Sequence, residues 1–199
     1  FDALGYHYFL RKQKHPVSLR DALYVALTGF YYSNITPGAS GGQPMQVYHM
    51  KQMNVPVGVG TSAVSLRIFC NQLMVVLSAS VLWVCNAGFV NAQLPTVRWA
   101  IIIGWVINFS AVPLVLLVAL HRPLVQSLLA FFIRVGAKIR LIKNPEAARV
   151  RVEAVLDSYH SSILRLGRHP RQIALHLVLS GCSMLGLMGV IVFVYRAFD

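Results

Sequence analysis

Charged side chains, and acidic ones above all, are scarce in this sequence of 199 residues. Only 12% of the residues are charged, and 6 are Asp or Glu, whereas a soluble domain carries about 25% charged residues. The windows 68–97, 99–121 and 172–195 contain no charged side chain. Each is long enough for a helix to cross a bilayer core of about 30 Å, which needs about 20 residues. A soluble chain of this length could not bury three such helices, so the sequence predicts membrane spans at 61–90, 99–121 and 172–195.

Other absences narrow the function. No acidic residue lies in the three spans or in the glycine- and proline-rich segment considered below. This disfavours a carrier coupled to protons or sodium, since such carriers usually keep a carboxylate inside the membrane. The 3 cysteines have no C-x-x-C spacing and the histidines no ligand spacing, so we expect no metal and no cofactor. The sequence also offers no paired carboxylates, Ser/His/Asp set or nucleotide-binding loop, and an enzyme active site within these residues is not expected.

Basic residues are abundant, and their distribution indicates topology. The net charge is +12, and ten of the 18 Lys and Arg residues fall within 122–171, between two predicted spans. Cytoplasmic loops of membrane proteins carry such an excess, so we do not expect nucleic acid as a partner. Residues 123–167 are predicted to form a cytoplasmic hairpin of two amphipathic helices on or near the membrane, the second beginning at Asn144 and Pro145. Its charges are either a solvated face attracted to anionic lipid or a specific site.

A polar segment rich in glycine and proline interrupts the N-terminal part of the chain at residues 33–48. Lipid tolerates irregular backbone only where it is buried in protein or lines a wet cavity. The preceding apolar run, 22–32, would rise only about 16 Å as a helix, and the basic regions on both sides look cytoplasmic. A re-entrant segment over 22–53, broken at 34–44, satisfies both observations. The alternative is a surface loop between two interfacial helices.

This broken segment is also the candidate binding site. Its neutral donors and acceptors suit a phosphate, because glycines in turns can present successive N–H groups to an anion. Arg67, at the start of the first span, either extends to the headgroups or faces a polar cavity together with Asn71 on the same helix face. A lipid phosphate would match its guanidinium group. The candidate residues for headgroup binding are Asn34, Thr36, Gly38, Ser40, Gly41, Gly42, Gln43, Gln46, Tyr48, Arg67 and Asn71. The alternative is that the segment serves packing alone.

The run from Tyr32 to Tyr48 resembles the membrane portion of the bacterial lysylphosphatidylglycerol synthase/flippase family, which includes the multiple peptide resistance factor. The shared pattern is a basic link, a short helix, an Asn-x-x-Pro-Gly break with paired glycines, and a span with an arginine in its first turns, here Arg67. Two features depart from it. Many members have an acid and an arginine where this chain has Gln43 and Gln46, and many have Glu where it has Leu66.

The resemblance implies an all-α integral membrane protein, a polytopic helical bundle that crosses the bacterial cytoplasmic (inner) membrane several times. It implies a flippase-like role in which phosphatidylglycerol or aminoacyl-phosphatidylglycerol binds at the broken helix, as in lipid transport linked to antibiotic resistance. The expected partners are an anionic or aminoacylated phospholipid, the membrane, and a second copy or a separate synthase domain. Nothing here resembles the aminoacyl-transferring domain, although the family can be described as a phosphatidylglycerol lysyltransferase. The start at Phe1 and the abrupt end at Asp199, three residues after Arg196, suggest a piece of a larger bundle.

Two other hypotheses remain open at this level. The chain could be a non-transporting membrane module that docks a lipid- or envelope-synthesis enzyme through its basic hairpin. It could also be a carrier of small solutes or ions, which the lack of carboxylates in the spans disfavours.

Overall fold

The computed structural model describes residues 1–93, 95–121, 123–127, 130 and 145–198, and the regular structure within these ranges is helical throughout. The all-α class expected from the sequence is therefore confirmed. The elements are α1 (Asp2–Lys12), α2 (Leu19–Ile35), the 3-10 helix η1 (Pro37–Ala39), α3 (Gly42–Gln52), α4 (Val57–Gln93), α5 (Pro95–Leu120), α7 (Pro145–Gly167) and α8 (Pro170–Ala197).

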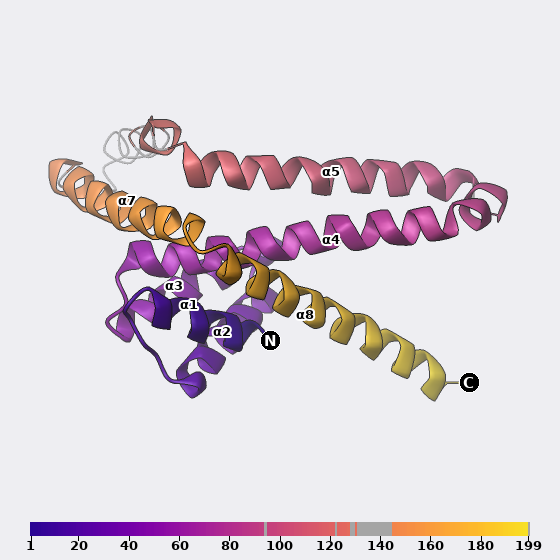
Figure 1. The fold of residues 1–199 in the computed structure, drawn as a ribbon, viewed down its shortest axis with the longest axis horizontal. Coiled ribbons are helices and arrows are strands. Elements are labelled where there is room, and N and C mark those ends of the chain that lie inside the picture. The colour runs from indigo at the N-terminus through magenta and orange to yellow at the C-terminus, as the bar shows by residue number, and fades with distance from the viewer. Residues whose placement is uncertain (94, 122, 128–129, 131–144, 199) are drawn as a thin grey trace.

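The helices form one packed end and two long extensions (Figure 1). Helices α1, α2 and α3 lie together against the first part of α4, and α7 packs along the same part of α4. The rest of α4 pairs with α5 in a long antiparallel hairpin, while α8 crosses α4 and extends away to the C-terminus. The packed end holds both the hydrophobic core and the polar groups of interest.

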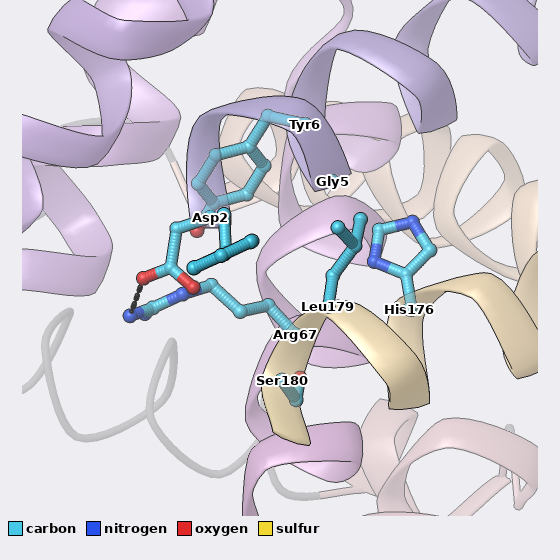
Figure 2. Close-up of a pocket in the computed structure, with 8 residues that line it drawn as sticks. Asp2, Gly5, Tyr6, Arg67, His176, Leu179 and Ser180 are labelled. Atoms are coloured by element: carbon cyan, nitrogen blue, oxygen red, sulfur yellow. Dashed lines mark hydrogen bonds and ion pairs between the residues drawn. The ribbon is translucent and has the colours of Figure 1, made fainter. Parts of the chain in front are cut away.

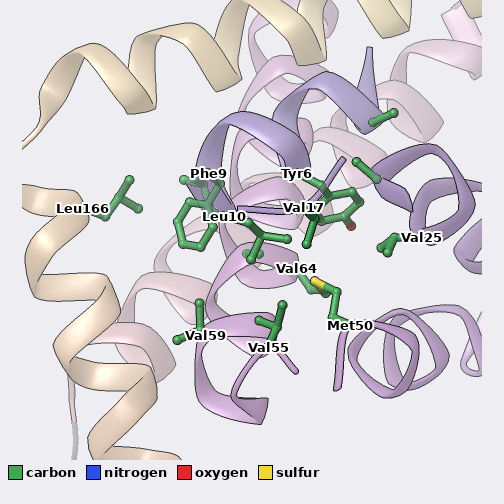
Figure 3. Close-up of a cluster of buried hydrophobic side chains, with 14 of the residues drawn as sticks. Tyr6, Phe9, Leu10, Val17, Val25, Met50, Val55, Val59, Val64 and Leu166 are labelled. Carbon is green, nitrogen blue, oxygen red and sulfur yellow. The ribbon is translucent and has the colours of Figure 1, made fainter. Parts of the chain in front are cut away.

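The core of the packed end is built by side chains from different helices (Figure 3). Phe9 and Leu10 of α1, Val25 of α2 and Met50 of α3 are completely buried. Leu166 of α7 closes one side of the cluster. These contacts fix α1 to α3 against α4, and so determine where the polar residues of α1, α2 and α3 meet.

The break between α2 and α3 is shorter than the predicted range 34–44. Helix α2 continues to Ile35, where the Asn34 side chain donates a hydrogen bond to the Phe30 carbonyl at 2.8 Å. Helix α3 already begins at Gly42. Its first turn can hold Pro44, because a backbone N–H at that position would have no intrahelical acceptor. With 17 residues α2 is about 25 Å long, longer than its apolar run 22–32, and the re-entrant course of 22–53 stays a prediction.

Within the break the backbone satisfies its own polar groups. Gly38 adopts a φ of 64°, a left-handed conformation that glycine favours. The Thr36 hydroxyl donates to the Tyr32 carbonyl at 2.6 Å and accepts from the Gly41 N–H at 2.9 Å. One side chain therefore ends α2 and starts the approach to α3.

Among the described residues, two helices are long and apolar enough to cross a membrane: Val57–Gly88 within α4 and all of α8. In α5 the apolar stretch Arg98–Pro113 is shorter than these two. The C-terminal half of α8 exposes large apolar side chains such as Leu185, Ile191 and Phe193, which suits contact with lipid. The predicted spans 61–90, 99–121 and 172–195 correspond to α4, α5 and α8, although α5 ends at Leu120, one residue before the second predicted span does. That these helices cross the bilayer stays a prediction.

The predicted hairpin 123–167 is described only in part. Its second helix is α7, which begins at Pro145 and ends at Gly167, as the sequence predicted. Residues 128–129 and 131–144 of the first helix lie outside the described residues. Helix α7 approaches α4 closely at Gly58, where an added Cβ would lie 2.5 Å from the Val155 carbonyl oxygen.

Candidate functional site

A cavity of about 140 Å³ opens where α1, α2, α3 and α4 meet. Its volume is close to the ~150 Å³ of a protein cavity that holds benzene, so a phosphate-sized group fits. Its lining residues are Asp2 of α1, Ala26, Gly29, Phe30 and Ser33 of α2, Gly42, Gln43 and Gln46 of α3, and Arg67 of α4.

Asp2 and Arg67, which both line this cavity, form an ion pair, marked by the dashed line in Figure 2. One terminal nitrogen of the guanidinium group donates to one carboxylate oxygen. The pair is neither fully buried nor free in solvent, since the side chains are 35% exposed for Arg67 and 30% for Asp2. The Nε of Arg67 is buried without a hydrogen-bond partner among the described residues. The ion pair uses one terminal nitrogen of a group with five N–H donors, so other terminal N–H groups of Arg67 are left for a ligand in the cavity.

Tyr6 and Gln46 form a buried hydrogen bond beside the ion pair. The Tyr6 hydroxyl donates to Oε1 of Gln46 at 3.0 Å, and the two residues are only 1% and 2% exposed. Burial raises the pKa of Tyr6 to about 12, an effect that the positive charge of Arg67 partly opposes. The phenol is therefore neutral near pH 7, and it holds the Gln46 side chain at the wall of the cavity.

Glycines let α2 and α3 approach closely enough to form this wall. A Cβ added at Gly29 would lie 2.0 Å from Nε2 of Gln46, and one added at Gly42 would lie 2.1 Å from the Ser33 hydroxyl. Real Cβ atoms do not approach other atoms so closely, so both positions require glycine for packing. At Gly38 an added Cβ would meet no atom within 4 Å, and the requirement there is the positive φ alone.

A second, smaller cavity also borders the ion pair (Figure 2). Its volume is about 10 Å³, roughly the room that one water needs. Asp2 and Arg67 line this cavity too, together with Tyr6, and Leu179 and His176 of α8 complete the side shown in Figure 2. The His176 ring is 5% exposed and packs edge-on against Phe9 of α1 at 6.2 Å between ring centres. The Asp2–Arg67 pair thus lines both cavities.

The structure brings together part of the predicted residue set. The cavity is lined by Gly42, Gln43, Gln46 and Arg67. The other candidates do not line it: Thr36 and Gly41 bond to each other, Asn34 and Ser40 bond to carbonyl groups one turn or less away, and Gly38, Tyr48 and Asn71 are exposed. Asn71 therefore does not accompany Arg67 into the cavity, although it follows it by one helical turn.

The list of candidates from the sequence lacked Tyr6 and five residues that line the cavity: Asp2, Ala26, Gly29, Phe30 and Ser33. The Asp2–Arg67 ion pair joins residues 65 positions apart, and no local sequence pattern predicts such a contact. One signal was available for Gly29, since a glycine inside an apolar helical run often marks a close approach of another backbone or side chain.

Comparison with known proteins supports the resemblance found in the sequence. A family model described as the lysylphosphatidylglycerol synthase TM region matches residues 1–199, the whole chain. No curated protein and no solved structure matches the chain. The resemblance drawn from the run 32–48 and Arg67 is confirmed by the family model. This chain belongs to the family of lysylphosphatidylglycerol synthase transmembrane regions.

Proposed function

We propose that this chain binds phospholipid headgroups in the cavity between α1, α2, α3 and α4, and that it moves phosphatidylglycerol or aminoacyl-phosphatidylglycerol between leaflets of the bacterial inner membrane. The observation that carries the proposal is Arg67. It is a cation on an apolar helix, and it borders a cavity of about 140 Å³. Ionisable residues in such helices usually mark substrate pathways, and a guanidinium group matches the geometry of a phosphate.

The remaining lining residues suit the two chemically different parts of a phospholipid. Ser33, Gln43 and Gln46 present neutral donors and acceptors to a phosphate or glycerol. Phe30 lines the same cavity and is 73% exposed, and its neighbours Leu27 and Tyr31 are exposed as well. A headgroup in the cavity would therefore leave its acyl chains beside an apolar face of α2.

The binding step is tested by native mass spectrometry of the intact protein with phosphatidylglycerol. Arg67→Gln and Gln43→Ala should each reduce retention of the lipid, because the first removes the cation and the second a neutral contact. Arg196→Gln is the matched control, since that arginine is exposed near the end of α8 and does not line the cavity. Gly42→Leu is unsuitable, because it would disrupt the packing of α2 on α3. Equal retention by all four proteins would place binding elsewhere.

The transport step needs a separate assay. Proteoliposomes with fluorescent phosphatidylglycerol are treated with a membrane-impermeant reductant that destroys the label in the outer leaflet. Purified protein should increase the fraction of label that becomes accessible, and Arg67→Gln should bring it back to the value of empty liposomes. Lipid binding without any increase in accessible label would retain the site and remove the flippase role.

A second candidate function rests on basic side chains at the junction of α1 and α7. The buried Gln13 donates from Nε2 to the Ser162 carbonyl at 3.2 Å and so fixes the C-terminal ends of the two helices beside each other. Exposed basic residues flank this contact: Arg11, Lys12, Lys14, Arg165 and Arg168. They suit the docking of an acidic surface on a lipid- or envelope-synthesis enzyme. In this case charge reversal of Arg11 and Arg165 would abolish complementation of a deletion strain, whereas Arg67→Gln would not.

A further inference from the structure

The larger cavity contains one positive and one negative lining residue. Among the described residues, the others that line it are uncharged, so this lining has no net charge. The two charges neutralise each other through the Asp2–Arg67 ion pair. A ligand that binds Arg67 must therefore either share the guanidinium group with the Asp2 carboxylate or displace that carboxylate.

Adding a phosphate alone would place two negative groups on one guanidinium group. The Asp2 side chain is 30% exposed, so water can compensate only part of the repulsion between them. If the phosphate displaced Asp2 from Arg67, a largely buried carboxylate would lose its partner, which is unfavourable in a protein interior. Asp2 therefore acts against a purely anionic ligand in either arrangement.

A headgroup that carries an ammonium group together with its phosphate avoids this cost. Its phosphate can bind Arg67 while its ammonium group binds the Asp2 carboxylate, so that each protein charge keeps a partner of opposite sign. The neighbouring hydroxyl and amide groups of Ser33 and Gln43 line the same cavity and can bond to the part of the headgroup between its two charges.

We propose that Asp2 determines the selectivity of the cavity, favouring phospholipid headgroups that bear both phosphate and ammonium over headgroups that bear phosphate alone. This inference rests on the proposed function, because it requires a headgroup at Arg67. It goes beyond it by assigning to Asp2, which is outside the broken segment, the choice between headgroup classes, so that of the two lipids proposed above the aminoacyl form is favoured.

The test compares phosphatidylethanolamine, which has both charges, with phosphatidylglycerol, which has only the phosphate. Retention of each lipid is measured by native mass spectrometry over a range of lipid concentrations. Wild type should prefer phosphatidylethanolamine by on the order of tenfold, the size expected for a partly solvated charge at short distance. Asp2→Asn should remove this preference, chiefly by strengthening the binding of phosphatidylglycerol. Asp2→Glu should retain it.

Glu153→Gln is the matched control, because it removes one negative charge from an exposed position on α7. Its lipid preference should equal that of the wild type. A thermal melt of each variant establishes that it is folded. Loss of both lipids to the same degree in folded Asp2→Asn, or an unchanged preference, would overturn the inference. If binding of neither lipid depends on Arg67, the proposed function itself fails, whereas dependence on Arg67 without selectivity from Asp2 refutes only the present inference.

Discussion

The contact between Gly29 and Gln46 gives the most demanding prediction for the fold of the site. In Gly29→Ala the new methyl group would lie 2.0 Å from Nε2, 2.4 Å from Cδ and 2.8 Å from Cγ of Gln46. The Gln46 side chain must therefore move, and the direction open to it is the adjacent cavity of about 140 Å³. The movement would break its 3.0 Å hydrogen bond with Tyr6.

The expected loss of stability follows from three contributions. A buried hydroxyl left without its partner costs about 1–3 kcal/mol, and overpacking costs a further ~1–3 kcal/mol if Gln46 cannot move freely. The better helix propensity of alanine returns about 1 kcal/mol. Because Gln46 can move into the cavity, overpacking is taken at about 1 kcal/mol, and the net destabilisation is about 2 kcal/mol, which for a chain of this size lowers the melting temperature by roughly 4–8 °C.

The assay is a thermal melt in detergent, followed by circular dichroism, with lipid retention measured in parallel. Gly186→Ala is the control, because an added Cβ there meets no atom within 4 Å in the same kind of helix. It should melt at or slightly above the temperature of the wild type, while Gly29→Ala should melt lower and retain less phosphatidylglycerol, since Gln46 then occupies the cavity. A melting temperature of Gly29→Ala within about 1 °C of the wild type would refute the packing argument.

Three further predictions concern single positions. The pKa of Tyr6 is raised by burial to about 12, so the folded state holds this proton more tightly than the unfolded state, and stability should fall by up to about 2–3 kcal/mol as the pH rises from 10 to 12. Tyr6→Phe should flatten that part of a stability–pH curve, and an equal slope in both proteins would contradict the assignment. Gly38→Ala should cost about 1 kcal/mol in a thermal melt, through its positive φ alone, and leave lipid retention unchanged. Gly58→Ala should destabilise the protein by more than Gly38→Ala does, because its Cβ would meet the rigid backbone carbonyl of Val155 at 2.5 Å rather than open space; equal melting temperatures of these two variants would speak against the close packing of α4 and α7.

The parts of the structure that depend on local sequence could be predicted, and those that depend on long-range packing could not. The apolar windows predicted α4, α5 and α8, because the length of an apolar stretch can be read from one segment of the sequence. The glycines and prolines also predicted the break between α2 and α3. They did not predict its limits, because Pro44 is tolerated in the first turn of a helix as well as in a loop. A sequence pattern does not distinguish these two settings.

The candidate site shows the same division. Arg67 could be selected because a cation at the start of an apolar span requires an explanation. Its partner Asp2 could not, because the contact depends on the packing of α1 against α4. Gln46 was selected as one of several polar residues in the broken segment, yet its burial beneath Gly29 distinguishes it from the exposed Gln43. Burial of this kind appears only once the helices are placed together.

The bond between Tyr6 and Gln46 also has a mechanical consequence. It ties α1 to α3, and the Gln46 side chain lies against Gly29 of α2, so a single amide side chain of α3 contacts both other helices. Helix α4 contributes only Arg67 to the lining of the larger cavity. On the α4 side the lining is held by the Asp2–Arg67 ion pair, which a ligand can open without separating α2 from α3.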